Sequence, residues 1–126
     1  MKRCFYTQNG PKAVGPYATA VIHAGVAYLS GMIPMVPDTG KLAEGGIQAQ
    51  ARQVLQNVCT VLSEMNLSPA DVLKTTIYLT DLQNFAAVNE IYASVFGPDF
   101  PARSCVEISA LPMVALIEIE ATAIAD

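Results

Sequence analysis

The spacing of apolar residues predicts two amphipathic helices in this chain. From Ile47 to Met65, apolar side chains recur at three- and four-residue steps with polar residues between them. A second apolar stripe runs from about Asp81 to Phe96, and Gly97-Pro98 ends it because proline cannot continue a helix. The residues of that second stripe are Phe85, Val88, Ile91, Tyr92, Val95 and Phe96.

The remaining apolar segments are short and rich in β-compatible residues. Residues 18–30 form such a segment, broken by His23-Ala24-Gly25 where glycine can adopt the positive φ of a tight turn, so we expect a β-hairpin. Ser68-Pro69-Ala70-Asp71 suits a short helical turn, and Pro, Gly and Asp make 34–46 a predicted loop. Strands are expected over 72–79, 102–109 and 116–124. In the first of these strands, one face is predicted to hold Leu73, Thr75, Ile77 and Leu79.

The order of these elements, β-β-α-β-α-β-β, predicts one α+β domain over residues 1–126, with two helices on one face of a mixed sheet. A chain of 126 residues is long enough for one hydrophobic core. Its residues are 52% hydrophobic and only 14% charged, against a usual charged share of about 25%. Because a monomer would have few charges to cover its surface, we infer a homo-oligomer with apolar interfaces.

Charge and composition exclude several classes of partner. A net charge of -4 and no cluster of Lys or Arg argue against nucleic acid. No apolar run approaches the roughly 20 residues that span a bilayer, and polar residues from Thr7 to Gly10 interrupt any signal peptide. We therefore expect a soluble, cytoplasmic protein.

The cysteines and the single histidine make a metal site or a disulfide framework an unfavoured interpretation. Cys4, Cys59 and Cys105 are widely spaced and form no CxxC pair, which fits reduced thiols. His23 is the only histidine, so recognisable zinc ligands are too few. We predict no metal.

Arg103 stands out because it lies within an apolar predicted strand and no other Lys or Arg follows Lys74. A guanidinium in such a place needs an anion, and its fork of donors matches a carboxylate or a phosphate. That anion is either a small ligand or a protein carboxylate such as Glu118 or Glu120 in the last strand. Strand alternation places Cys105 on the same side as Arg103, but sequence spacing alone leaves both alternatives open.

Other polar residues each have a structural alternative to a functional role. Cys105 is favoured as a packed or site-lining thiol over a nucleophile, because no base has a visible relation to it. His23 is favoured as a solvated turn residue. Ser30-Gly31 ends a strand, where it can close a turn or bind a ligand, and Gly15-Pro16-Tyr17 can aim a ring and hydroxyl into a pocket. No Walker loop, GxGxxG, GxSxG or histidine-based triad is present.

Several motifs taken together resemble the Rid (YjgF-like) family of reactive imine deaminases over nearly the whole chain. The resemblance implies a chorismate-mutase-like α+β fold, a homotrimer and sites in the clefts between subunits. The motifs are Gly15-Pro16-Tyr17, Ser30-Gly31-Met32-Ile33-Pro34, Pro37-Asp38-Thr39-Gly40, Gln50-Ala51-Arg52, Pro101-Ala102-Arg103-Ser104-Cys105-Val106-Glu107, Leu111-Pro112 and Ile117-Glu118-Ile119-Glu120.

The resemblance also implies hydrolysis of 2-imino acids, such as 2-iminobutanoate and 2-iminopropanoate, to 2-oxo acids and ammonia. This activity would protect pyridoxal-phosphate enzymes from 2-aminoacrylate damage and requires no cofactor. Arg103 would hold the substrate carboxylate and Glu118 would activate water. The other residues expected to line the site are Tyr17, Ser30, Gly31, Asn89 and Cys105. Met32, Ala110 and Met113 depart from residues common in the family, which bears on substrate preference.

Two other functions compete with imine hydrolysis. One is a non-enzymatic trimer that binds small carboxylates or partner proteins as a regulator or chaperone, and it too would use Arg103. The other is ribonuclease activity, which has been attached to the wider family. It ranks last because the acidic chain has no basic track and no histidine pair for acid-base cleavage.

Overall fold

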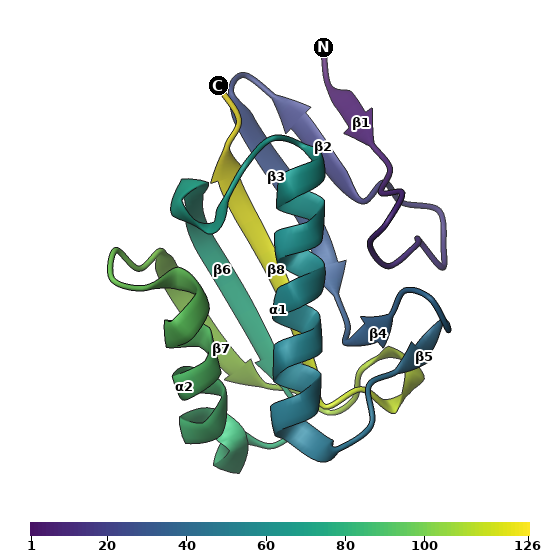
Figure 1. Ribbon diagram of the computed structural model, residues 1–126, viewed down its shortest axis with the longest axis vertical. Coiled ribbons are helices and arrows are strands. Elements are labelled where there is room, and N and C mark those ends of the chain that lie inside the picture. Colours follow the sequence, from purple (N-terminus) through teal and green to yellow (C-terminus); the bar gives the residue numbers. More distant parts are fainter.

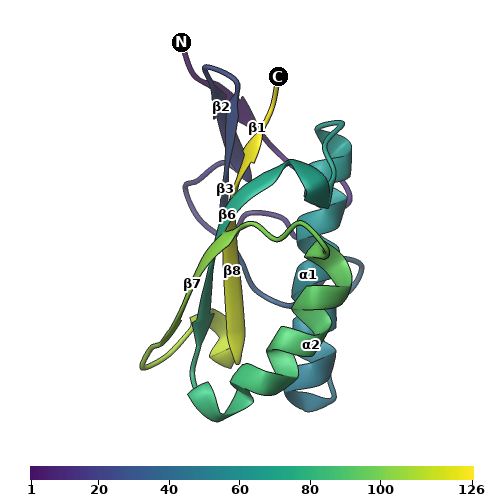
Figure 2. The ribbon, with the colours of Figure 1, turned by 90° about the vertical axis from the view of Figure 1, so that its left-hand side faces the viewer.

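The computed structural model describes residues 1–126 as a β-sheet covered on one face by two helices (Figures 1 and 2). Figure 2 shows both helices on the same side of the sheet, so its other face is uncovered in the single chain. The predicted α+β architecture is therefore confirmed. The elements are β1 (Arg3–Phe5), β2 (Ala20–His23), β3 (Val26–Met32), β4 (Met35–Val36), β5 (Lys41–Leu42), α1 (Gly46–Glu64), η1 (Pro69–Asp71), β6 (Val72–Leu79), η2 (Leu82–Asn84), α2 (Phe85–Phe96), β7 (Ala102–Glu107), η3 (Pro112–Val114) and β8 (Ile117–Ile124).

Six strands form the main sheet in the order β1-β2-β3-β8-β6-β7. Neighbouring strands are antiparallel except β6 and β7, which are parallel. A parallel pair needs a crossover connection, and α2 supplies it. The last strand, β8, lies between β3 and β6, so the two halves of the chain pair through it.

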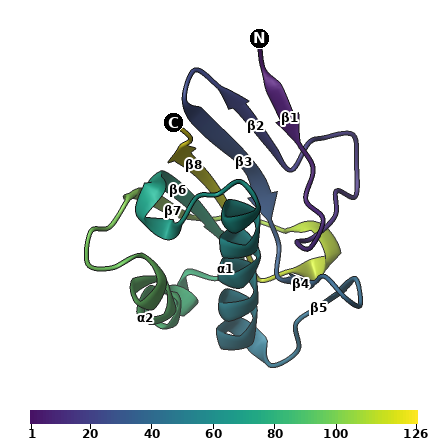
Figure 3. The same ribbon diagram turned by 45° about the horizontal axis from the view of Figure 1, so that its top comes forward.

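The helix α1 packs across the middle of the sheet (Figure 3). It begins where Gly45 and Gly46 have φ of 115° and 79°, values that favour glycine. Its buried apolar residues include Val54, Leu55 and Val58, which belong to the same core cluster as the sheet residues Ile77 and Ile119. Each fully buried side chain of this size contributes roughly 1.5–3 kcal/mol. Neither helix is long and apolar enough to cross a membrane.

The second predicted helix is divided in two. The Asp81 side chain accepts a hydrogen bond from the Gln83 N–H at 2.9 Å and caps the short helical turn η2, after which α2 begins. Of the predicted stripe, Val88, Tyr92 and Phe96 are buried, whereas Phe85 is 41% exposed. The periodicity therefore identified the helix and most of its packed face.

Three sequence predictions are wrong in detail. The predicted element order lacks β1, whose residues Arg3–Phe5 pair with β2. Residues 34–46 are not all loop, because β4 and β5 pair as a short antiparallel hairpin. Leu73 does not share the buried face of β6 with Thr75 and Ile77. The pairing of β6 with β8 shifts between Val72 and Lys74, so Val72 is buried and Leu73 is 44% exposed.

The N-terminal segment is fastened to the end of α1 by the Glu64 carboxylate. The Thr7 hydroxyl donates to this carboxylate at 2.5 Å, the Asn9 N–H at 2.7 Å and the Gln8 N–H at 3.3 Å. Burial disfavours the charged form, but these hydrogen bonds outweigh it and lower the pKa of Glu64. The donors also offset the unfavourable position of an anion at a helix C-terminus.

Replacing Glu64 by glutamine should reduce the free energy of unfolding by about 1 kcal/mol at neutral pH, allowing for solvent exposure of the site. Because the folded-state pKa is lowered, the carboxylate stabilises the fold fully above its unfolded pKa, and this stabilisation is lost as the pH falls through the folded pKa. Urea unfolding at fixed protein concentration should therefore show a difference between wild type and Glu64→Gln that shrinks below about pH 4.

Glu44→Gln, at an exposed position before α1, removes the same charge and is the matched control. It should leave the urea midpoint close to that of the wild type, both at neutral pH and below about pH 4. A Glu64→Gln effect no larger than that of Glu44→Gln would show that the carboxylate does not hold the N-terminal segment.

Candidate functional site

Within one chain, the seven residues expected at the site form two separate groups. The first, here called the Glu118 group, consists of Tyr17, Ser30, Gly31 and Glu118, which all line one pocket. The second, the Arg103 group, consists of Asn89, Arg103 and Cys105. Asn89 and Arg103 line a different pocket, and Cys105 follows on the same face of β7.

The Glu118 group lies where β3 departs from regular pairing. The register of β3 against β8 shifts between Leu29 and Met32, as at a β-bulge, and Ser30-Gly31 occupies that irregularity. A Cβ added to Gly31 would lie 2.5 Å from Glu118 Oε2, so the carboxylate rests directly against the glycine backbone. Any larger residue at Gly31 would displace Glu118.

The two other members of the Glu118 group also have structural contacts. The Ser30 hydroxyl donates to the Ala18 carbonyl at 2.7 Å, which joins β3 to the segment before β2. The Tyr17 hydroxyl accepts from the Val14 N–H at 3.2 Å, and this turn leaves the ring 43% exposed at the pocket rim. Ser30 therefore lies within β3 and closes no turn; its hydroxyl joins β3 to the segment before β2, and the residue also lines the pocket.

Buried polar residues of α1 hold the backbone around this pocket. Asn57 is 1% exposed and donates to the carbonyls of Ile33 and Met35 at 3.2 and 2.8 Å. The Gln50 side-chain oxygen accepts from the Leu116 N–H at 2.8 Å, directly before β8. Because backbone groups buried without partners are costly, these bonds fix the ends of β3 and β8 that carry the pocket.

The surroundings of the Glu118 carboxyl favour its protonated form. Burial raises its pKa, and the negative charge of Glu120 on the same face of β8 raises it further. Perturbed carboxyls in a pocket are typical of catalytic acids and bases.

The Arg103 guanidinium is held by three side chains of α2. It donates to the Asn89 side-chain oxygen at 2.8 Å and lies 5.4 Å from the ring centroid of Phe85 and 5.0 Å from that of Tyr92. Tyr92 is itself fixed by a 2.6 Å hydrogen bond with Thr75 on β6. Cation–π contacts of this kind contribute about 0.5–1 kcal/mol each and orient the charge.

Phe85 and Tyr92 were not among the residues expected at the site. They follow helical spacing with Asn89 along one side of α2, and apolar periodicity alone assigns both aromatics to the packed stripe. The presence of Arg103 in the following predicted strand was the signal that could have identified them, because aromatic rings often stack on a guanidinium.

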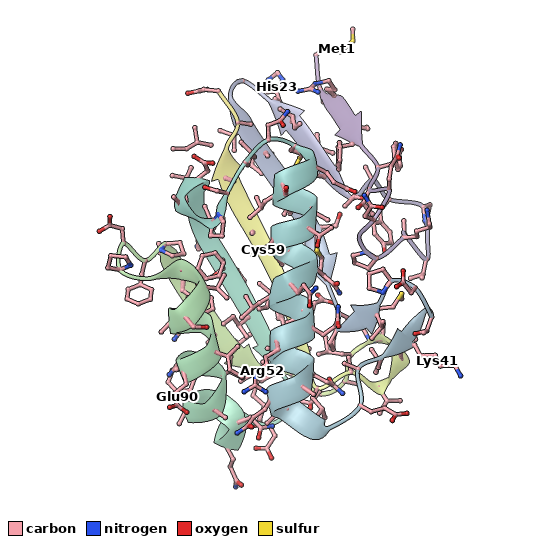
Figure 4. All side chains as sticks on the ribbon, viewed as in Figure 1. Met1, His23, Lys41, Arg52, Cys59 and Glu90 are labelled. Carbon is pink, nitrogen blue, oxygen red and sulfur yellow. The ribbon has the colours of Figure 1, made fainter.

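Cys105 lacks the surroundings of an activated thiolate. Burial raises the pKa of its thiol, and the opposing effect of Arg103 is smaller. The only histidine, His23, is exposed at the end of β2, at the tip of the hairpin (Figure 4). The arrangement favours a site-lining thiol over a nucleophile.

The two groups lie on opposite faces of the sheet. Arg103 pairs with Thr75, which is buried beneath the helices, whereas Glu118 pairs with Tyr78 on the uncovered side. The strand β6 separates β7 from β8. A pair between Arg103 and Glu118 or Glu120 within one chain, one of the two alternatives for its partner anion, is therefore excluded.

The acidic residue on the same face of β7 as Arg103 also has a different partner. Glu107 accepts a hydrogen bond from the Leu82 N–H at 2.8 Å. Arg103 is thus left with an amide oxygen from its own chain and with donors free for an outside anion. No group of three or more His, Cys, Asp or Glu side chains is placed to hold a metal ion.

Comparison with known proteins agrees with this fold. The family model described as endoribonuclease L-PSP matches residues 7–125. A RutC family protein of Pyrococcus horikoshii is 46% identical over 98% of both chains, and a 2-iminobutanoate/2-iminopropanoate deaminase of Salmonella typhimurium is 43% identical, also over 98% of both. The solved structure of YyfA, a Rid-family protein of Yersinia pestis, has a TM-score of 0.94 and 48% identity, covering 98% of this chain and 99% of that one. Matches over nearly the full length show that the chain belongs to the Rid (YjgF-like) family.

Proposed function

We propose that this protein hydrolyses reactive 2-imino acids, such as 2-iminobutanoate and 2-iminopropanoate, to 2-oxo acids and ammonia. The observation that carries the proposal is the separation of Arg103 and Glu118 on opposite sheet faces, with a pocket at each. A homotrimer would join the Arg103 group of one protomer to the Glu118 group of the next. The deaminase name of a relative 43% identical to this chain supports the same chemistry.

The Arg103 group is suited to hold the substrate carboxylate. Phe85 and Tyr92 orient the guanidinium, and Asn89 occupies one of its donors. The remaining donors can form a bidentate pair with a carboxylate, which fixes the orientation of the imine as well as its position. An arginine oriented before binding loses less conformational freedom when the ligand arrives.

The Glu118 group is suited to supply water. In the proposed reaction, Glu118 takes a proton from water as the oxygen bonds to the imine carbon, and the proton passes to the nitrogen. Glu118 then takes the hydroxyl proton and passes it to the amine nitrogen, so the carbon–nitrogen bond breaks, the carbonyl forms and ammonia leaves. An imine is already electrophilic, so positioning and proton transfer suffice.

A non-enzymatic role in binding small carboxylates is the alternative. It would need the Arg103 group alone, and it gives no use to a half-buried Glu118 with a raised pKa beside Gly31. Ribonuclease activity is supported by the description of the matching family model but not by the residues of the site, because the chain has a net charge of -4 and its single histidine lies at an exposed hairpin end.

Glu118→Gln should abolish imine hydrolysis while sparing much of the binding, because the amide keeps the size of the side chain but cannot accept the proton. Threonine dehydratase would generate the imine and semicarbazide would trap it, so hydrolysis is measured as loss of trapped product. Arg103→Ala should instead weaken binding of the product 2-oxobutanoate roughly 10- to 100-fold, because each charge-assisted hydrogen bond is worth about 1.5–3 kcal/mol.

Calorimetric titration with 2-oxobutanoate separates binding from turnover in both variants. Glu90→Gln on α2 serves as the control for loss of one negative charge and should behave as the wild type. Wild-type protein that adds nothing to the spontaneous rate of imine loss would refute the proposed hydrolysis. Tight binding of 2-oxobutanoate in that case would favour the non-enzymatic alternative.

Mixing Arg103→Ala with Glu118→Gln should give more activity than the sum of the two variants assayed separately. If each site takes its two groups from different protomers, random assembly of equal amounts produces intact sites at about one quarter of the interfaces. The mixture would be prepared by co-refolding and assayed as above. Activity no higher than the sum of the separate variants would exclude a site shared between protomers.

A further inference from the structure

We propose that Glu120 and Tyr78 are positioning residues for Glu118. Tyr78 holds the Glu120 carboxylate beside that of Glu118, and this second carboxylate enables Glu118 to take up and return a proton during turnover. The inference rests on the proposed function, since it assigns a purpose to the surroundings of the proposed base. Neither residue was among those expected at the site.

The geometry of the uncovered sheet face brings the three side chains together. Glu118 and Glu120 are alternate residues of β8, and Ile117 and Ile119 point to the buried side. Tyr78 on β6 lies directly opposite Glu118 in the register. Its hydroxyl nevertheless donates to Glu120 Oε1, so the tyrosine reaches diagonally along β8 and fixes the Glu120 carboxylate.

Glu118 has little freedom to move away from that second carboxylate. On its β3 side it rests against Gly31, where an added Cβ would lie 2.5 Å from Oε2. On its β6 side it faces Tyr78, the residue that holds Glu120 in place. The repulsion between the two carboxylates is therefore built into the sheet.

The titratable and charged groups around Glu118 come from three elements. Within one chain they are Glu120 on β8, Tyr78 on β6, and Lys12 and Tyr17 in the segment before β2; Lys74 on β6 lines a pocket with Glu120, and the adjacent part of β3, Ser30-Gly31, contributes none. Lys12 is exposed, so water screens its charge. Burial raises the pKa of Glu118 most, and the charge of Glu120 raises it further.

The pKa of Tyr78 is also changed by its contact with Glu120. Its hydrogen bond to Glu120, with burial and the charges of both glutamates, raises the pKa of Tyr78. Tyr78 therefore stays protonated as a donor over the working range of pH. The Tyr78 hydroxyl and the Glu120 carboxylate form a hydrogen-bonded pair, whereas Glu118 has no such partner on β6.

A raised pKa suits the proton transfers of the proposed reaction. A carboxylate of higher pKa is a stronger base toward water, and its acid form then carries the proton to the imine nitrogen. The same carboxylate accepts the hydroxyl proton when the carbon–nitrogen bond breaks and delivers it to the departing ammonia. No proton is gained or lost by Glu118 over one cycle.

The test is a pH titration of the full-length protein with carbon-13 in its glutamate side-chain carboxyls, followed by NMR. The Glu118 signal is identified by its loss in Glu118→Gln. In Glu120→Gln the Glu118 midpoint should move to lower pH, because a neighbouring negative charge has been removed. Tyr78→Phe should move it in the same direction by less, since Glu120 remains but is no longer fixed.

Glu90→Gln is the matched control, because Glu90 lies on α2 on the helix side of the sheet (Figure 4) and its loss changes the net charge equally. It should leave the Glu118 midpoint in place. In the imine assay, the acid limb of kcat/KM should follow the NMR midpoint to lower pH in Glu120→Gln, with affinity for 2-oxobutanoate unchanged.

An unchanged Glu118 midpoint in Glu120→Gln would overturn the inference, whether or not the protein hydrolyses imines. A lowered midpoint in a protein without hydrolytic activity would confirm the coupling of the three side chains and reject only the proposed function. Loss of 2-oxobutanoate affinity in Tyr78→Phe without any change in the Glu118 midpoint would assign Tyr78 to binding and contradict its positioning role.

Discussion

The alternation of side chains across β7, β6 and β8 is the constraint on which the site depends. Because β6 pairs with both neighbours, one register sets the face of Arg103 and the other sets the face of Glu118. A slip of one residue in either pairing would exchange the faces. In the observed registers Arg103 lies under α2 and Glu118 lies on the uncovered side, so a site that contains both requires residues of two chains.

The helix α1 stabilises this arrangement through its polar residues as much as through its apolar stripe. Asn57 and Gln50 bind the backbone at the ends of β3 and β8, and Glu64 binds the N-terminal segment that leads to Tyr17. Each bond satisfies a backbone group that the sheet cannot pair. One helix therefore sets the position of three connecting segments around the Glu118 pocket.

Local patterns predicted the helices and most strands to within a few residues, because periodicity reports which face of an element is buried. They failed where pairing with a distant strand overrides local order. Leu73 is exposed because β6 shifts its register against β8, and Met35–Val36 forms a strand because Lys41–Leu42 can pair with it. Neither strand pairing can be predicted from the residues of one strand alone.

The candidate site, like the fold, could be predicted only in part from local sequence patterns. Resemblance named its residues, and strand alternation correctly placed Cys105 beside Arg103. Periodicity marked Phe85 and Tyr92 as packed residues but could not say that they pack on a guanidinium. Tyr78 carried no signal, because its bond to Glu120 joins residues that are distant in the chain.

The sequence by itself determined the α+β class, the amphipathic faces of both helices and the isolation of Arg103 as a cation without a local anion. Those properties depend on composition and on neighbours a few residues away. Only the tertiary structure decided that Arg103 faces α2, that Glu118 lies against Gly31 beside a fixed Glu120, and that the two halves of the site are separated by the sheet. Strand order and register decide these relations, because they bring together residues that no local pattern connects.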